Sequence, residues 1–346
     1  MATIRDLPYE LLELVLHHAV SDVDLTSSPA AIGSRNTWLR QCSTISRSFR
    51  CPAQAVLWSS LRVHSPAMVK RILASPVLGQ FAVHSLDLVG VHAGVEGLSG
   101  STAARVLTKL SRGLRWLRLA DFGRLSARVL QNENLSALRT LILMTTFPDK
   151  PVVLTSLHLP FHLRSLSLFN RSYPSAFISR LFTSSSHTLR SLTVLTNVSA
   201  SSYPALVASF PLVAPNLRHL SLQHRPSADL VAHFPLLTSL THLECHVAVD
   251  LAAVLDALPT PSPPTLTHLT LELDYNLLEV SALLVARLSD PTSALRGLEH
   301  LTIPRAPDVQ EFGEFGGQGL LEMCREKGIR VEVGKVVAWR TRSVFD

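Results

Sequence analysis

Four histidines that recur at one position of a repeated pattern are the residues of this sequence best suited to chemistry. They are His219, His242, His268 and His300, and each is the third residue of a Leu-x-His-Leu segment. Imidazole titrates near neutral pH, and its neutral form both donates and accepts a hydrogen bond. Adjacent parallel strands lie about 4.8 Å apart, so neighbouring strands would align these histidines in a ladder. We expect the ladder either to contact a polar partner or to reflect only the frequent use of polar residues at this position.

A row of arginines occupies the position before the histidines. Five consecutive segments carry it, at Arg115, Arg139, Arg164, Arg190 and Arg218. Guanidinium groups favour carboxylates and phosphates because their N–H donors match paired anionic oxygens. The row therefore fits either an acidic or phosphorylated partner, or a structural and solubilising role.

Sequence signatures of catalysis and cofactor binding are missing. The chain contains no GxxxxGK[ST], GxGxxG, GxSxG or HExxH motif. His242, Cys245 and His246 suggest a metal site, but in an extended strand Cys245 faces the core. The two histidines would then lie about 13 Å apart, which is too far for one metal ion. We therefore expect no metal, no cofactor and no enzymatic activity.

The chemistry-bearing residues are positioned by a six-residue frame, apolar-x-x-apolar-x-apolar, that recurs along most of the chain. Copies begin at Val83, Leu114, Leu138, Leu163, Leu189, Leu217, Leu240, Leu266 and Leu298, with a weaker copy at Gly328. Neighbouring copies start 23 to 32 residues apart, as in leucine-rich repeats. A plain α/β domain with parallel strands is the alternative, but it does not require one pattern at near-constant intervals. The frame predicts an α/β leucine-rich-repeat solenoid, a horseshoe of about ten units over residues 63–336, followed by a tail at 337–346.

The frame also predicts which side chains are buried. Alternate residues of a strand face opposite ways, so the fourth and sixth positions point into the core. Segments 101–113, 174–182 and 280–289 space apolar residues three or four apart and predict helices on the convex side. The exposed positions near each strand would line a concave, target-binding surface. Besides the four histidines, that surface comprises Trp116, Arg118, Met144, Phe169, Gln223, Glu244, His246 and Glu272.

Residues 1–62 do not share the repeat and predict a small helical module. Segment 6–20 fits a helix with an apolar stripe. The stripe comprises Leu11, Leu12, Val15, Leu16 and Ala19. We expect Pro8 in the first turn, where its missing N–H costs little, and Asp6 as the N-cap. A polar loop at 21–36 and a second apolar segment at 39–63 follow.

Leu7-Pro8 before a leucine-rich helix, the Ser46–Arg50 segment and the pair Leu57-Trp58 form a recognisable combination. Further matching residues are Glu10, Leu11, Leu12, Val15, Leu16, Leu39, Cys42 and Ile45. On these residues, segment 4–62 resembles the F-box family, and the whole chain resembles the fungal F-box proteins that carry leucine-rich repeats. The 21–36 loop is longer than the compact family pattern.

The resemblance implies a role in ubiquitin ligation. In the F-box family this module docks on a Skp-type adaptor, which links it to a cullin–RING ligase. The chain would be the substrate-recognition subunit of an SCF-type ligase, holding a target protein on its repeats. The implied docking residues are Leu7, Pro8, Leu11, Leu12, Val15, Leu16, Leu57 and Trp58. The alternative is an interaction scaffold without a ligase role, whose helices only cap the first repeat, because a solenoid needs capped ends.

Composition narrows the partners and the compartment. The formal charge of +6 permits nucleic-acid binding, but the basic residues form no dense run, so we expect a protein partner instead. No window of eighteen uncharged apolar residues predicts a membrane span. Charges at Arg5, Asp6, Glu10 and Glu13 do not fit a secretory signal. Four cysteines without CxxC spacing are typical of reduced thiols, which favours the cytoplasm or the nucleus.

Overall fold

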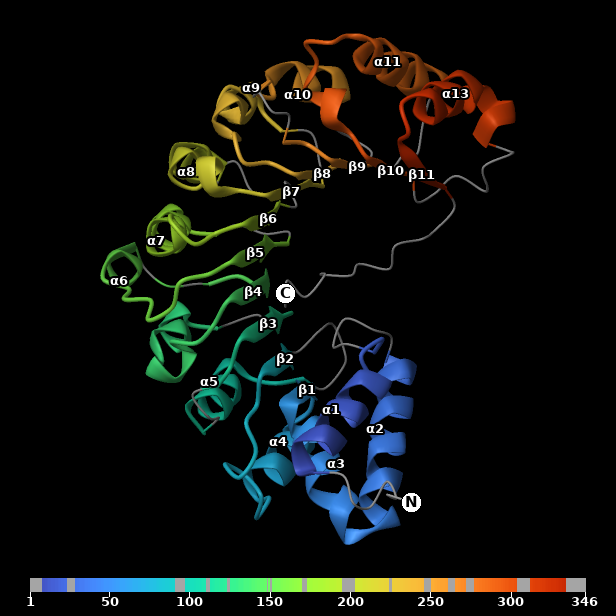
Figure 1. Ribbon diagram of the computed structural model, residues 1–346. Helices are drawn as coiled ribbons and strands as arrows, with labels where there is room; N and C mark the ends of the chain where they lie inside the picture. The colour runs from blue at the N-terminus through green and yellow to red at the C-terminus, as the bar shows by residue number, and fades with distance from the viewer. Residues whose placement is uncertain are drawn as a thin grey trace. The chain divides into compact units, whose positions relative to one another are not determined.

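The computed structural model forms two compact units (Figure 1). Unit 1 comprises Met1–Asp149, Leu157–Phe161 and Ala338–Asp346, and unit 2 comprises Lys150–Ser156 and His162–Val337. The structure describes residues 8–23, 29–90, 97–109, 113–122, 125–147, 149, 151–169, 173–194, 203–223, 226–245, 250–260, 265–271, 277–303 and 312–333. Within these ranges no helix combines the length and the apolar character needed to cross a membrane.

Unit 1 begins with three helices packed around a small apolar core. They are α1 (Tyr9–Ala19), α2 (Pro29–Ile45) and α3 (Arg47–Ser59). The core comprises Leu16, Val20, Leu39, Cys42, Ala53 and Val56, with Phe49 and Leu57 packed against it. Because α3 packs against both α1 and α2, it is the central helix of this helical module.

Helix α2 begins earlier than the sequence predicts. It starts at Pro29, so the polar loop expected over 21–36 extends at most to residue 28. Ile32, Leu39 and Cys42 are buried at helical spacing. Their burial against the other helices outweighs the weak helix propensity of Gly33 and the polar residues around it.

Pro8 lies before the first turn of α1, not within it as expected. It is the N-cap residue, and its φ of −53° and ψ of 152° are not helical. Its carbonyl oxygen accepts hydrogen bonds from the N–H groups of Leu11 and Leu12, both at 3.1 Å. Proline suits this position because it needs no N–H of its own to start the helix. Asp6, the expected N-cap, lies outside the described residues.

The rest of unit 1 alternates strands with helices. Its strands are β1 (Ser60–Val63), β2 (Ser85–Val89), β3 (Trp116–Ala120) and β4 (Thr140–Met144). Its helices are α4 (Pro66–Leu73), α5 (Gly100–Lys109) and the 3₁₀ turns η2 (Ala127–Gln131) and η3 (Glu133–Leu135). The four strands are parallel and pair in chain order. Strand β1 was missed: Trp58–Val63 fits the frame, so the strands begin before the predicted boundary at residue 62.

Unit 2 repeats the same alternation. Its strands are β5 (Ser165–Leu168), β6 (Ser191–Val194), β7 (His219–Leu222), β8 (His242–Cys245), β9 (His268–Leu271), β10 (His300–Ile303) and β11 (Arg330–Val333). Its α-helices are α6 (Pro151–Thr155), α7 (Ser175–Ser185), α8 (Tyr203–Ser209), α9 (Ala228–Val231), α10 (Leu251–Ala257), α11 (Leu277–Ser289) and α13 (Gln318–Glu326). Shorter turns are η4 (Phe210–Leu212), η5 (Ala214–Asn216), η6 (Phe234–Leu236), η7 (Ala294–Gly297) and η8 (Gly313–Gly317). These strands too are parallel and pair in chain order. The predicted helices at 101–113, 174–182 and 280–289 are confirmed as α5, α7 and α11.

In both units, every strand predicted by a frame begins at the third position of that frame. From β2 to β10, all residues at the fourth and sixth positions are buried, as predicted. They face the helices that connect the strands, from α4 onward, which lie along one side of the strands of each unit in Figure 1. Each fully buried leucine stabilises the fold by about 1.5–3 kcal/mol. We call the opposite face of the strands, which carries the third and fifth positions, the open face.

A repeated backbone arrangement fixes where each strand starts. Between β2 and β4 and between β5 and β10, the carbonyl oxygen at the second frame position accepts two N–H groups, from the second and third positions of the next frame. Arg190 O, for example, accepts from Arg218 N at 2.8 Å and His219 N at 2.9 Å. Thr241 O accepts from Thr267 N and His268 N, both at 3.0 Å. These paired bonds prevent neighbouring frames from slipping against each other.

The packing predicts that one cysteine alone reacts in the native chain. Cys42, Cys245 and Cys324 are buried, whereas Cys51 is exposed on α3. Burial raises the pKa of Cys324 to about 11 and also raises the pKa values of Cys42 and Cys245, so their reactive thiolates are scarce at pH 8. Iodoacetamide should therefore modify Cys51 rapidly and the other three only after denaturation. Peptide mass spectrometry over time measures this, and early modification of Cys245 would contradict the predicted core.

Candidate functional site

The side chains of α1 that were predicted to dock an adaptor divide into two sets. Leu12 and Leu16 are buried, and Leu16 belongs to the core of the helical module. Leu11 and Val15 are 47% and 50% exposed. The expected single stripe is therefore divided, because one set packs against the module and the other reaches solvent.

The remaining described residues of the predicted docking set lie at the start of α1 and at the end of α3. Pro8 is exposed at the start of α1, whereas Leu57 and Trp58 are partly buried at the end of α3. Leu7 lies outside the described residues. Sequence reasoning missed Tyr9 and Leu14, which are 41% and 64% exposed on α1. Leu14 lies three residues after Leu11, so helical spacing was a signal that could have identified it.

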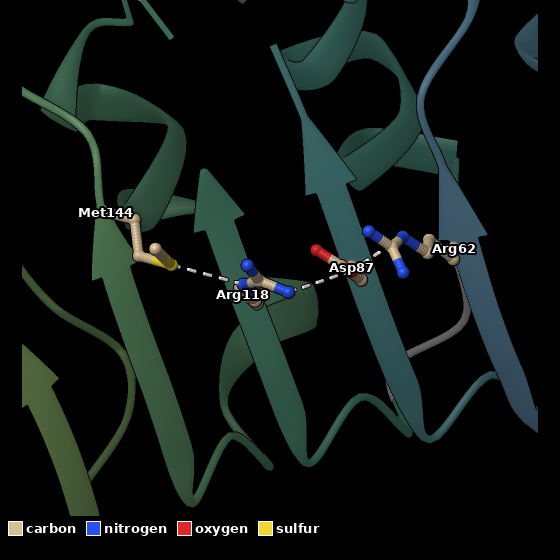
Figure 2. A network of polar contacts seen from close by, with 4 residues as sticks. All are labelled: Arg62, Asp87, Arg118 and Met144. Carbon is tan, nitrogen blue, oxygen red and sulfur yellow. Dashed lines mark hydrogen bonds and ion pairs between the residues drawn. The ribbon is translucent and has the colours of Figure 1, made fainter. Parts of the chain in front are cut away.

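The open face of unit 1 carries an ion-pair row. The fifth frame positions of β1, β2 and β3 are Arg62, Asp87 and Arg118, and they pair in register. Arg62 Nε and Arg118 Nη1 lie 3.3 and 3.4 Å from the same oxygen, Asp87 Oδ2. Figure 2 shows the carboxylate between the two guanidinium groups, and Arg118 Nε also donates to Met144 Sδ at 3.3 Å. Sequence reasoning named Arg118 and Met144 but missed Arg62, because β1 was not recognised as a strand.

Asp87 is the most unusual group in this row. It is 0% exposed, because a paired strand with a long side chain lies on each side. Burial raises the pKa of Asp87, although Arg118 and Arg62 oppose that shift. Its Oδ1 atom is buried without a hydrogen-bond partner among the described residues. The carboxylate is therefore paired through one oxygen and unsatisfied at the other.

The histidine ladder is present on the open face of unit 2, as predicted. His219, His242, His268 and His300 pair in register across β7 to β10. Successive ring centroids lie 6.0, 4.0 and 4.4 Å apart, and the last two pairs are stacked, with interplanar angles of 15° and 16°. The four imidazoles therefore form one continuous row of rings on this face.

Threonines one residue earlier in the chain fix the two central rings. Nδ1 of His242 lies 2.8 Å from Thr241 Oγ1, and Nδ1 of His268 lies 2.8 Å from Thr267 Oγ1. Each hydroxyl donates its single proton to a backbone carbonyl, of Arg218 at 2.9 Å and of Thr241 at 3.2 Å. With the hydroxyl proton so placed, Nδ1 carries the hydrogen and Nε2 is the acceptor of each neutral ring.

An acidic group lies beside the first ring of the ladder. Glu244 on β8 places Oε2 3.7 Å from Nε2 of His219 on β7.

The predicted direction of Cys245 into the core is confirmed, since it is buried. Over the described ranges no three His, Cys, Asp or Glu side chains are grouped to hold a metal ion. His246 and Glu272 lie outside those ranges.

Two residues expected on the target-binding surface are buried instead. Trp116 and Gln223 are each only 6% exposed, so the expectation of exposure is wrong for both. Trp116 aligns with Ser85 of β2 and Thr140 of β4, and Gln223 Nε2 donates to Ser221 Oγ at 3.1 Å. Phe169 is partly buried, and its carbonyl oxygen accepts from the Tyr173 hydroxyl at 3.3 Å.

Two arginines of the second-position row have structural partners. Arg139 Nη1 donates to the carbonyl oxygen of Leu138 at 3.3 Å. Arg190 Nη1 donates to that of Asn216 at 3.2 Å, just before the next frame. The Arg190 side chain therefore links its frame to the turn before the next one, as the structural alternative for this row predicts, whereas the Arg139 bond stays within its own frame.

The burial of Asp87 predicts a pH-dependent stability. Because its pKa is raised in the folded chain, the folded state binds more protons than the unfolded state near the ordinary titration range of a carboxyl. Stability therefore falls as the pH rises from below the ordinary pKa through the raised one. As the pH rises over this interval, the free energy of unfolding of the wild type should fall relative to that of an Asp87→Asn chain. Urea denaturation of both chains from acid to neutral pH measures the difference, and a difference that is constant or opposite in sign would contradict it.

The threonine contacts predict the tautomers of the ladder. At neutral pH, ¹⁵N chemical shifts should identify His242 and His268 as Nδ1–H tautomers. Thr241→Val removes the hydroxyl and should reduce the Nδ1–H population of His242, whereas Thr241→Ser keeps the acceptor and should preserve it. An Nε2–H tautomer at both histidines of the wild type would show that the hydroxyl contacts do not persist in solution.

Comparison with protein-family models and with curated proteins finds no match for this chain. Its function is therefore argued from three features: the exposed side chains of α1, the ion-pair row of unit 1 and the histidine ladder of unit 2.

Proposed function

We propose that this chain is the substrate-recognition subunit of an SCF-type cullin–RING ubiquitin ligase. The helical module binds a Skp-type adaptor, and the leucine-rich repeats bind a target protein. The chain supplies proximity alone: it holds the target near a charged ubiquitin-conjugating enzyme, and none of its residues takes part in covalent chemistry. It uses no cofactor and acts in the cytoplasm or the nucleus.

The observation that carries this proposal is the exposed apolar face of α1. Leu11, Leu14 and Val15 are about half exposed or more, while Leu12 and Leu16 anchor the adjacent, buried side of the helix. Apolar groups at i, i+3 and i+4 form one continuous surface on a helix. A helix that served only as a cap would turn its apolar side chains inward and leave a polar outer face. An exposed apolar stripe on an anchored helix favours a protein partner.

The open faces support a protein target as the second partner. They present partly exposed arginine, histidine, methionine and glutamate side chains on rigid strands. Arginine and methionine are enriched at protein interfaces. A repeat scaffold without a ligase role would use the same faces, so the adaptor is the partner that distinguishes the two functions.

Polar substitutions on the exposed side of α1 should weaken adaptor binding. Leu11→Ser with Val15→Ser removes two apolar groups worth about 1.5–3 kcal/mol each when buried by a partner, so affinity should fall by about tenfold or more. The fold should persist, because neither side chain is buried in the module. Isothermal titration calorimetry with a purified Skp-type adaptor measures the change.

The matched control removes two exposed leucines from unit 2. Leu212 and Leu278 are 49% and 63% exposed. Leu212→Ser with Leu278→Ser should leave adaptor affinity at the wild-type value. Failure of the wild-type chain to bind any Skp-type adaptor would reject the ligase role and favour the scaffold. Equal binding by both double variants would reject the face of α1 as the docking site.

A further inference from the structure

We infer that Arg62 and Arg118 form a binding site for one anionic side chain of a protein partner, a carboxylate or a phosphorylated hydroxyl. The site lies on the open face of unit 1, at the ion-pair row of Figure 2. It needs no contribution from the adaptor-binding helix, and it goes beyond the proposed ligase role by assigning a ligand chemistry.

The ion pairs leave much of the binding capacity of both arginines unused. A guanidinium group has five N–H donors, and in a strong structural pair two of them bond one carboxylate at about 2.7–2.9 Å. Here each arginine makes one long contact to the same oxygen, at 3.3 and 3.4 Å. Oδ1, which a bidentate pair would engage, has no partner among the described residues. Asp87 thus orients the two guanidinium groups without saturating them.

Both arginines can reach a ligand from the open face. Their side chains are 25% and 21% exposed, whereas Asp87 is completely covered. The two groups converge on one oxygen atom from β1 and β3, so they face each other across β2. Arg118 is further fixed by its contact with Met144 Sδ. Guanidinium groups held in place in this way lose little side-chain entropy when they bind an anion.

The local charge favours a single anionic group over a polyanion. Within the ion-pair row the two arginines outnumber the buried Asp87 by one charge; Asp121 and His64 also act on this carboxyl, and Asp121 is itself acidic. The positive charge left in the row is one at most, which suits one carboxylate or phosphate. A nucleic acid requires a wider basic surface, because its affinity depends on several phosphate contacts. A protein side chain is therefore the occupant that fits.

The test uses the full-length chain and three short peptides, Ac-Gly-Gly-X-Gly-Gly-NH₂, in which X is phosphoserine, glutamate or serine. Arginine Nε–H NMR signals, assigned by substitution, report binding. We expect saturable shifts of the Arg62 and Arg118 signals with phosphoserine or glutamate and none with serine. Shifts with the phosphoserine peptide alone would show that the site requires a phosphate. Similar shifts with the phosphoserine and glutamate peptides would show that a carboxylate is sufficient for binding.

A triple variant provides the matched comparison. Arg62→Gln, Asp87→Asn and Arg118→Gln together remove both guanidinium groups without leaving a buried, unpaired carboxylate, so the fold should persist. Its net charge falls by one, as does that of Arg105→Gln on the exposed side of α5. Loss of charge-assisted hydrogen bonds should weaken peptide binding by about tenfold or more in the triple variant, whereas Arg105→Gln should bind normally.

Three results would overturn the inference. Equal affinity of the wild type and the triple variant would show that the ion-pair row is not the site. Binding of the serine peptide as tight as that of the charged peptides would reject an anion site. Displacement of the phosphoserine peptide by a ten-nucleotide oligouridine at lower concentration would assign the arginines to nucleic acid. The adaptor is absent from this experiment, so its outcome is independent of the proposed ligase role.

Discussion

The pairing of equivalent frame positions is the constraint on which the rest of this structure depends. The carbonyl oxygen at the second position of one frame accepts two N–H groups of the next, so neighbouring frames cannot shift by a residue. A shift of one residue would turn every buried leucine to the open face and every polar side chain to the core. Leu192, Leu220 and Leu243 therefore lie side by side, each almost completely buried. Leucine packing and backbone hydrogen bonding favour the same register.

The same register turns sequence repetition into rows of side chains on the open face. Where the third position is histidine in consecutive frames, the result is a stack of rings with centroids 4.0 and 4.4 Å apart. Where the fifth position alternates arginine, aspartate and arginine, the result is a row of ion pairs. The two rows differ in their electrostatics. The ladder stacks like groups, whereas opposite charges compensate each other beside Asp87.

Sequence reasoning predicted the periodic features of this chain well. Strand starts, the inward fourth and sixth positions and the histidine ladder follow from spacing alone, and the structure agrees with each. It failed where tertiary packing overrides a local signal. Trp116 was expected on the surface because its position alternates with the core, but flanking strands enclose it. The start of α2 was missed because Gly33 and its polar neighbours resemble a loop, and only burial against α1 and α3 favours the helix.

The burial of Asp87 is not a requirement of the strand geometry. In the neighbouring strand, the equivalent fifth position next to Arg118 is Ile142, which is 2% exposed. An apolar side chain therefore fits this row, and it would avoid the cost of desolvating a carboxylate. Replacing a buried ion pair by apolar residues is often neutral or stabilising. The aspartate therefore contributes less to stability than to the arrangement of the row: it holds two long, flexible arginine side chains in one orientation at the surface. Arginines held in this way are suited to the anion-binding role that we infer for the row.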